Sequence, residues 1–153
     1  LLNHKAHKAH LVSIKNKENT PENGQNFCET TLSKSISPLD IVILGMGEDG
    51  HFASIFPHME NTEKLLNRFQ PRLCMPAHPE GKPSRMSLTL SYLLSAKHIY
   101  LFISGDKKKA IVQDAIDKKM SQTTHPIVAL IHERLNVMEQ VEKEPVQIYW
   151  NAV

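Results

Sequence analysis

The clearest pattern along the chain is a pair of largely apolar runs, each of which ends at a glycine. The first run is Ile41 to Leu44, followed by Gly45, and the second is HIYLFIS at 98–104, followed by Gly105. An apolar run bounded by glycine is typical of a buried strand in a parallel sheet. The sequence therefore predicts two central strands that both end in a turn.

The segments around these runs predict helices and shorter strands. Apolar residues recur at helical spacing over 27–36, where Phe27 and Leu32 belong to the pattern, and again over 106–118. Asn61-Thr62 predicts the start of a short helix that ends at Leu66. Short strands are expected over 72–77, 86–90 and 146–150, a helical turn over 91–96, and loops over 16–26, 78–84 and 135–145. The apolar segment 126–131 fits either a helical turn or a strand. This alternation predicts a single α/β domain over residues 1–153, with a mainly parallel sheet flanked by helices.

The first strand leads into the most distinctive turn of the chain. Gly45, Gly47 and Gly50 allow positive φ and close approach of a ligand, and the turn delivers His51 at the carboxyl edge of the sheet, where α/β folds bind ligands. One interpretation is a plain strand-to-helix turn. A second is a dinucleotide-binding G-x-G-x-x-G motif, but Pro57 stops the helix that this motif requires. A third is an acid/base histidine, because imidazole titrates near neutral pH.

The wider motif resembles a known family. The segment GMGEDGHFASIFP at 45–57 is similar to the signature of the 6-phosphogluconolactonases, which share a superfamily with the glucosamine-6-phosphate deaminases. The deaminases carry an Asn-Glu-Pro-like ending that is absent here. The resemblance continues through 83–89, Ser104-Gly105 with Lys108, and 146–150, while Phe52 and Ile55 depart mildly from the usual Thr and Leu. It implies a Rossmann-like, glucosamine-6-phosphate-deaminase-like fold.

The resemblance also implies an activity, the hydrolysis of 6-phosphoglucono-1,5-lactone to 6-phosphogluconate in the oxidative pentose phosphate pathway, without a metal or other cofactor. His51 would be the general base that activates water, and Asp49 would orient it or shape the turn. Arg85, with Lys82, would hold the phosphate. The three glycines of the turn and Lys108 would contact the substrate, although exposed loop or helix lysines are equally good interpretations of Lys82 and Lys108.

An amino-terminal portion of the family's pattern, with a Gly-rich phosphate loop, is not found in these residues. We therefore expect the chain to be a fragment, a truncated version or a divergent short form, with a bare strand edge. Two alternatives to the lactonase stay open. One is a sugar-phosphate isomerase or deaminase, and the other is a non-catalytic binding domain.

Net charge and cysteine spacing limit the classes of partner and compartment that we expect for the protein. The chain has 153 residues and a formal net charge of +2, which gives no reason to expect nucleic acid or a membrane as partner. A small sugar phosphate is the ligand that the resemblance implies. Cys28 and Cys74 fit no metal or redox spacing and predict reduced thiols in a cytoplasmic protein. His4, His7 and His10 predict a solvated basic face rather than a metal site. The oligomeric state does not follow from the sequence.

Overall fold

A computed structural model describes residues 7–35, 38–138 and 143–152 of the chain. Its helices are α1 (Pro21–Ser35), α2 (Thr62–Leu66), α3 (Leu90–Leu94), α4 (Asp106–Ile116) and α5 (Ile127–Met138). Its strands are β1 (Ile41–Gly45), β2 (Cys74–Ala77), β3 (Arg85–Leu88), β4 (His98–Ser104) and β5 (Gln147–Asn151). The predicted α/β class, with a mainly parallel sheet and flanking helices, is confirmed.

The main sheet is parallel, with the strand order β1-β4-β5. Gly45 at the end of β1 pairs in register with Phe102 of β4, so the glycine turn after β1 lies beside the end of β4. Within the described part of the chain, no strand pairs with the outer edge of β1. The register therefore places the two predicted turns, after Gly45 and at Gly105, at the same edge of the sheet.

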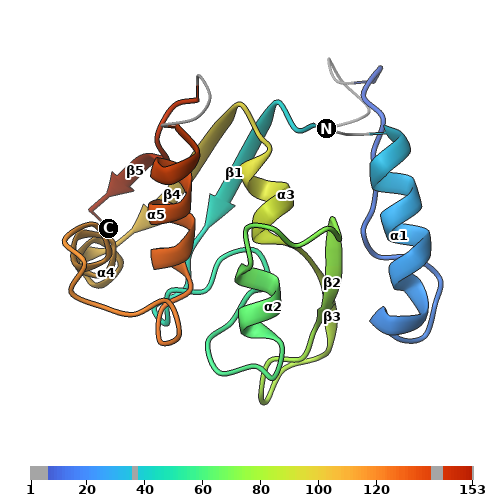
Figure 1. Ribbon diagram of the computed structural model, residues 1–153, viewed down its shortest axis with the longest axis horizontal. Coiled ribbons are helices and arrows are strands. Elements are labelled where there is room, and N and C mark those ends of the chain that lie inside the picture. The colour runs from blue at the N-terminus through green and yellow to red at the C-terminus, as the bar shows by residue number, and fades with distance from the viewer. Residues whose placement is uncertain (1–6, 36–37, 139–142, 153) are drawn as a thin grey trace.

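One face of this sheet is packed and the other is open. The packed face carries Leu44, Ile99 and Leu101, which join a core with residues of α3, α4 and α5 (Figure 1). On the open face the side chain of Ile43 is 71% exposed, and the Phe102 ring stacks on Tyr149 with the centroids 5.0 Å apart. Parallel sheets are ordinarily covered on both faces, so this open apolar face is an unusual feature of the described structure.

A second layer consists of the antiparallel hairpin β2–β3 with α1 against it, on the far side of the molecule from α4 (Figure 1). Cys28 and Leu32 of α1 pack with Cys74, Met86 and Tyr92 in a small separate core. The Glu29 carboxylate accepts hydrogen bonds from the backbone N–H groups of residues 73 and 74, at 2.8 and 3.3 Å. These contacts fix α1 to the hairpin.

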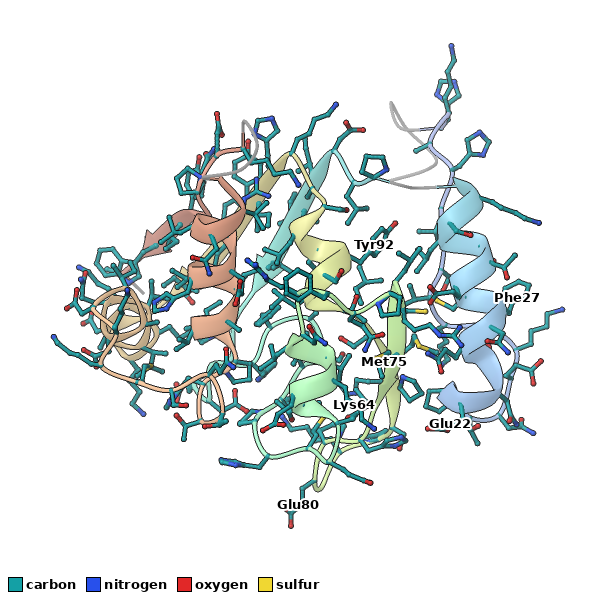
Figure 2. All side chains as sticks on the ribbon, in the orientation of Figure 1. Glu22, Phe27, Lys64, Met75, Glu80 and Tyr92 are labelled. Carbon is teal, nitrogen blue, oxygen red and sulfur yellow. The ribbon has the colours of Figure 1, made fainter. Side chains whose placement is uncertain are left out.

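The structure corrects the predicted start of the first helix. α1 begins at Pro21, within the segment 16–26 that was predicted as a loop, and Thr20 caps it by accepting a hydrogen bond from the Asn23 N–H at 3.3 Å. Proline at the first helical position is favourable because its missing N–H would have no partner there. Phe27, which was placed in the apolar pattern, points outward from α1 and is 62% exposed (Figure 2). The inward face carries Cys28 and Leu32 instead.

The carboxy-terminal half differs from the prediction at α5. The apolar segment 126–131 is the beginning of a helix that continues to Met138, within a segment expected to be a loop. Arg134 on this helix is fully buried, and its guanidinium donates hydrogen bonds to the carbonyls of residues 94, 96, 97 and 144. The helix is therefore tied to the chain before β4 and before β5. None of the helices among the described residues has the length and apolar character to cross a membrane.

Candidate active site

The turn after β1 is closed by its own backbone. The Gly47 N–H donates to the His51 carbonyl at 2.9 Å, and the Gly50 N–H donates to the Gly47 carbonyl at 3.1 Å. Gly50 has a φ of 73°, and a Cβ there would lie 2.8 Å from the Cβ of His125, so only glycine fits. Because these two N–H groups are used within the turn, they are not available to stabilise an oxyanion.

His51 and Asp49 form a tight pair on this turn. The Asp49 Oδ1 lies 2.5 Å from the His51 Nδ1 and also accepts the His51 backbone N–H at 3.1 Å. Partial burial raises the pKa of the Asp49 carboxyl, but the hydrogen bonds from His51 outweigh burial and leave this pKa below its ordinary value. Asp49 is therefore a carboxylate at neutral pH. An Nδ1–H that donates to this carboxylate leaves Nε2 as the proton acceptor of His51.

A hollow of about 520 Å³ opens at the end of β1, in front of this pair. It is lined by Ile43, Leu44, Gly45, Met46, Gly47, His51, Ala53 and Lys108. The hollow therefore combines an apolar wall, a proton acceptor and a cation.

The three lysines at the start of α4 have separate surroundings. Lys108 reaches the hollow, whereas the Lys107 Nζ lies 3.6 Å from the Glu48 carboxylate and the Lys109 Nζ lies 3.9 Å from the centroid of the Trp150 ring. Cations in the first turn of a helix oppose its dipole. A carboxylate and an aromatic ring offset this for Lys107 and Lys109. Lys108 borders the hollow and pairs with neither kind of group among the residues that the structure describes.

The ring of Phe56 lies near the histidine and near both predicted phosphate-binding residues. The Phe56 and His51 rings stack with their centroids 4.0 Å apart and a 23° angle between the planes. The Lys82 Nζ lies 4.4 Å from the Phe56 centroid, and the Arg85 guanidinium carbon lies 5.8 Å from it. Arg85 is oriented by a 3.0 Å hydrogen bond from its Nε to the Pro83 carbonyl. The ring of Phe56 therefore lies beside the histidine and beside two cations.

The structure thus groups most of the predicted site. Gly45, Gly47, His51 and Lys108 border one hollow, and Asp49 is bonded to His51. Arg85 does not line that hollow; it borders a second one of about 420 Å³ between 83–86 and 14–24. Gly50 is buried, and its missing Cβ faces His125, so its predicted contact with the substrate stays a prediction.

Phe56 and His125 were missed by the sequence analysis. The signal for Phe56 was its place in the ASIFP ending, which was used to identify the family and not to assign a role. Nothing in the local sequence of His125 places it against the glycine turn. No group of three potential metal ligands exists among the residues described, and His4 of the expected basic face lies outside them.

Comparison with known proteins identifies the family. The family described as glucosamine-6-phosphate isomerases/6-phosphogluconolactonase matches residues 1–139. The chain belongs to this family. The 6-phosphogluconolactonase of Pseudomonas putida is 36% identical over 116 residues, which are 75% of this chain and 43% of that protein. The 6-phosphogluconolactonase of Rhizobium meliloti (strain 1021) is 32% identical over 152 residues, which are 98% of this chain and 61% of that protein.

Solved structures agree with the family assignment. A 6-phosphogluconolactonase from Shewanella baltica OS155 superposes with a TM-score of 0.81 and 31% identity, covering 99% of this chain and 60% of that one. A monomeric glucosamine-6-phosphate deaminase shares the fold, with a TM-score of 0.59 and 17% identity. The chain therefore spans about three fifths or less of the length of these lactonase relatives.

Proposed function

We propose that this family member hydrolyses 6-phosphoglucono-1,5-lactone to 6-phosphogluconate, a step of the oxidative pentose phosphate pathway. The observation that carries the proposal is the His51–Asp49 pair at a hollow that Lys108 also borders, with Arg85 and Lys82 near the Phe56 ring on which His51 stacks. A phosphorylated lactone needs one proton acceptor at its carbonyl end and cations at its phosphate end. The relatives named 6-phosphogluconolactonase support the same activity.

The proposed reaction uses each of these groups in turn. His51 Nε2 takes a proton from water, and the hydroxide attacks the lactone carbonyl carbon to give a tetrahedral oxyanion. Asp49 holds the imidazole and stabilises its protonated form. The oxyanion then collapses, the bond from the carbonyl carbon to the ring oxygen breaks, and His51 returns the proton to that oxygen.

Lys108 is the group we assign to the oxyanion. It borders the same hollow as His51, while the N–H groups of Gly47 and Gly50 are engaged within the turn. A donor aimed at developing charge contributes about 100- to 1,000-fold to kcat. Gly45 and Gly47 form the floor of the hollow under the substrate.

Arg85 and Lys82 are assigned to the phosphate. A guanidinium can donate two parallel hydrogen bonds to a phosphate, and the ammonium adds charge without a fixed direction. Binding at the phosphate then orients the lactone carbonyl toward His51. We propose the cytoplasm as the location, which is where two free thiols such as Cys28 and Cys74 persist.

The test is the rate of 6-phosphogluconate formation from freshly prepared lactone, above spontaneous hydrolysis. His51→Ala should lower kcat by about 100- to 10,000-fold, and Arg85→Ala should raise KM by about ten- to a hundredfold. His98→Ala is the matched control, because the His98 Nδ1 also lies beside a carboxylate, at 3.1 Å from Glu144, away from the hollow. Arg68→Ala is the control for Arg85, since Arg68 also lies over an aromatic ring.

Loss of activity in the His51 variant with full activity in the His98 variant would support the assignment. Hydrolysis by the wild-type chain that does not change in His51→Ala would contradict it. Release of ammonia from glucosamine 6-phosphate would favour the deaminase alternative.

A further inference from the structure

Phe56 lies beside three of the groups to which the chemistry has been assigned. Its side chain is only 6% exposed, and its ring stacks on His51 and lies near the Lys82 ammonium and the Arg85 guanidinium. His51 belongs to the turn after β1, whereas Lys82 and Arg85 belong to the β2–β3 hairpin. The ring therefore joins the two parts of the proposed site.

The backbone on both sides of Phe56 is held in place. The Phe56 carbonyl accepts a 2.8 Å hydrogen bond from the hydroxyl of the buried Thr62. Two residues earlier, the Ser54 N–H donates to the hydroxyl of Ser87 on β3 at 3.1 Å. The ring is consequently a fixed surface between the turn and the hairpin, and it does not depend on a flexible loop.

Lys82 itself lies in the exposed loop between β2 and β3, where a lysine has many rotamers. The face of an aromatic ring is electron-rich and attracts an ammonium or guanidinium group. Contact with Phe56 therefore restricts where the Lys82 charge lies. The same ring restricts the plane of the His51 imidazole, which Asp49 fixes at only one of its atoms.

We propose that Phe56 is a positioning residue that couples the base to the phosphate-binding cations, by holding the His51 ring and the Lys82 ammonium against one rigid aromatic surface. This inference rests on the proposed lactonase function for its kinetic consequence. Its structural consequence is that a change at Lys82 alters the position of the His51 ring through Phe56. This consequence does not depend on turnover.

The variants are Phe56→Leu, which removes the aromatic surface, and Phe56→Tyr, which keeps it. Phe52→Leu is the matched control, because Phe52 is fully buried four residues earlier and belongs to the main core. Phe56→Leu should raise KM about two- to fivefold and lower kcat about two- to tenfold. Phe56→Tyr should keep both within about twofold, and Phe52→Leu should lower the melting temperature without this change in KM and kcat.

Lys82→Met completes a double-mutant cycle. If Phe56 acts on KM by placing Lys82, the double variant should have the KM of Lys82→Met alone, while the loss of kcat from Phe56→Leu persists. KM effects that multiply in the double variant would overturn the coupling.

NMR spectroscopy without substrate tests whether Phe56 couples Lys82 to His51. Lys82→Met should move the imidazole resonances of His51 in the wild-type background and leave them unmoved in the Phe56→Leu background. Equal movement in both backgrounds, or none in the wild type, would overturn the proposal. A wild-type chain without lactonase activity would refute the proposed function, and the NMR result would still decide the role of Phe56.

Discussion

Replacing Gly50 with alanine tests how the glycine turn holds the histidine. The φ of 73° at Gly50 costs an L-residue about 1–2 kcal/mol. The new Cβ would also lie 2.8 Å from the Cβ and 3.0 Å from the Cα of His125, and such overpacking costs about 1–3 kcal/mol more. We therefore expect Gly50→Ala to lower the free energy of unfolding by about 2–5 kcal/mol.

Gly81 is a natural control for this substitution. It has a similar φ of 68°, but a Cβ there would meet nothing within 4 Å. Gly81→Ala should therefore cost only the backbone strain, about 1–2 kcal/mol. The stiffening of the unfolded chain by alanine is common to both variants and cancels in their difference. That difference isolates the contact with His125.

Urea denaturation of the two variants gives both free energies. A second experiment places Gly50→Ala in a His125→Gly background, where the close contacts with the Cβ and Cδ2 of His125 are absent and the contact with its Cα remains, so part of the loss should be recovered. Gly50→Ala and Gly81→Ala with free energies of unfolding within about 0.5 kcal/mol of each other would refute the packing of residue 125 on the turn.

Three further predictions concern other charged or reactive groups. The pKa of Asp49 is lowered from its ordinary value of 3.8, so its contribution to stability is present above about pH 4 and is lost as the pH falls through the lowered pKa. The melting-temperature difference between wild type and Asp49→Asn should therefore shrink in acid, and a difference that grows would contradict the pairing with His51. Arg134→Leu should lower the free energy of unfolding by about 3–5 kcal/mol, because it removes the buried donor of four carbonyls, although the Leu94 carbonyl keeps its 2.8 Å hydrogen bond from Lys143. Calorimetry that finds a loss under about 1 kcal/mol would contradict this. Burial raises the pKa of the Cys28 and Cys74 thiols, so iodoacetamide should label them at pH 8 only after unfolding; labelling of the native protein at the rate of a free thiol would refute their burial.

The sequence was sufficient for the strands and turn that position the histidine. Ile41 to Leu44 is β-branched, the run 98–104 is largely apolar, and each is followed by a glycine, so local pattern and tertiary environment favour the same structure. The predicted fold class followed from these segments, and the family followed from the motif at 45–57. α1 was harder, because Pro21 and Gly24 are typical of loops, and only the cap by Thr20 distinguishes a proline that starts a helix.

Features that depend on long-range contacts were not accessible from the sequence. Lys82 lies over Phe56 only because the β2–β3 hairpin packs against the turn after β1, and the two residues are far apart in the chain. The burial of Arg134 likewise depends on carbonyls from two separate segments. Local propensity carries no information about such pairs.

The open face of the sheet has a consequence for handling the protein. Ile43 and Phe102 are exposed there, beside the unpaired edge of β1 in the described structure. Exposed apolar faces and bare strand edges favour association with other chains. Measurements of activity should therefore be made over a range of protein concentrations.

The central claim is that His51, held by Asp49, activates water for lactone hydrolysis. The most direct test is the pH dependence of kcat for wild type and His51→Ala, measured on freshly prepared 6-phosphogluconolactone with His98→Ala as the control. The account predicts a wild-type rate that rises as a single group loses its proton, a profile that His98→Ala keeps and that disappears with His51→Ala. An enzyme-dependent rate with the same profile in His51→Ala would contradict the account.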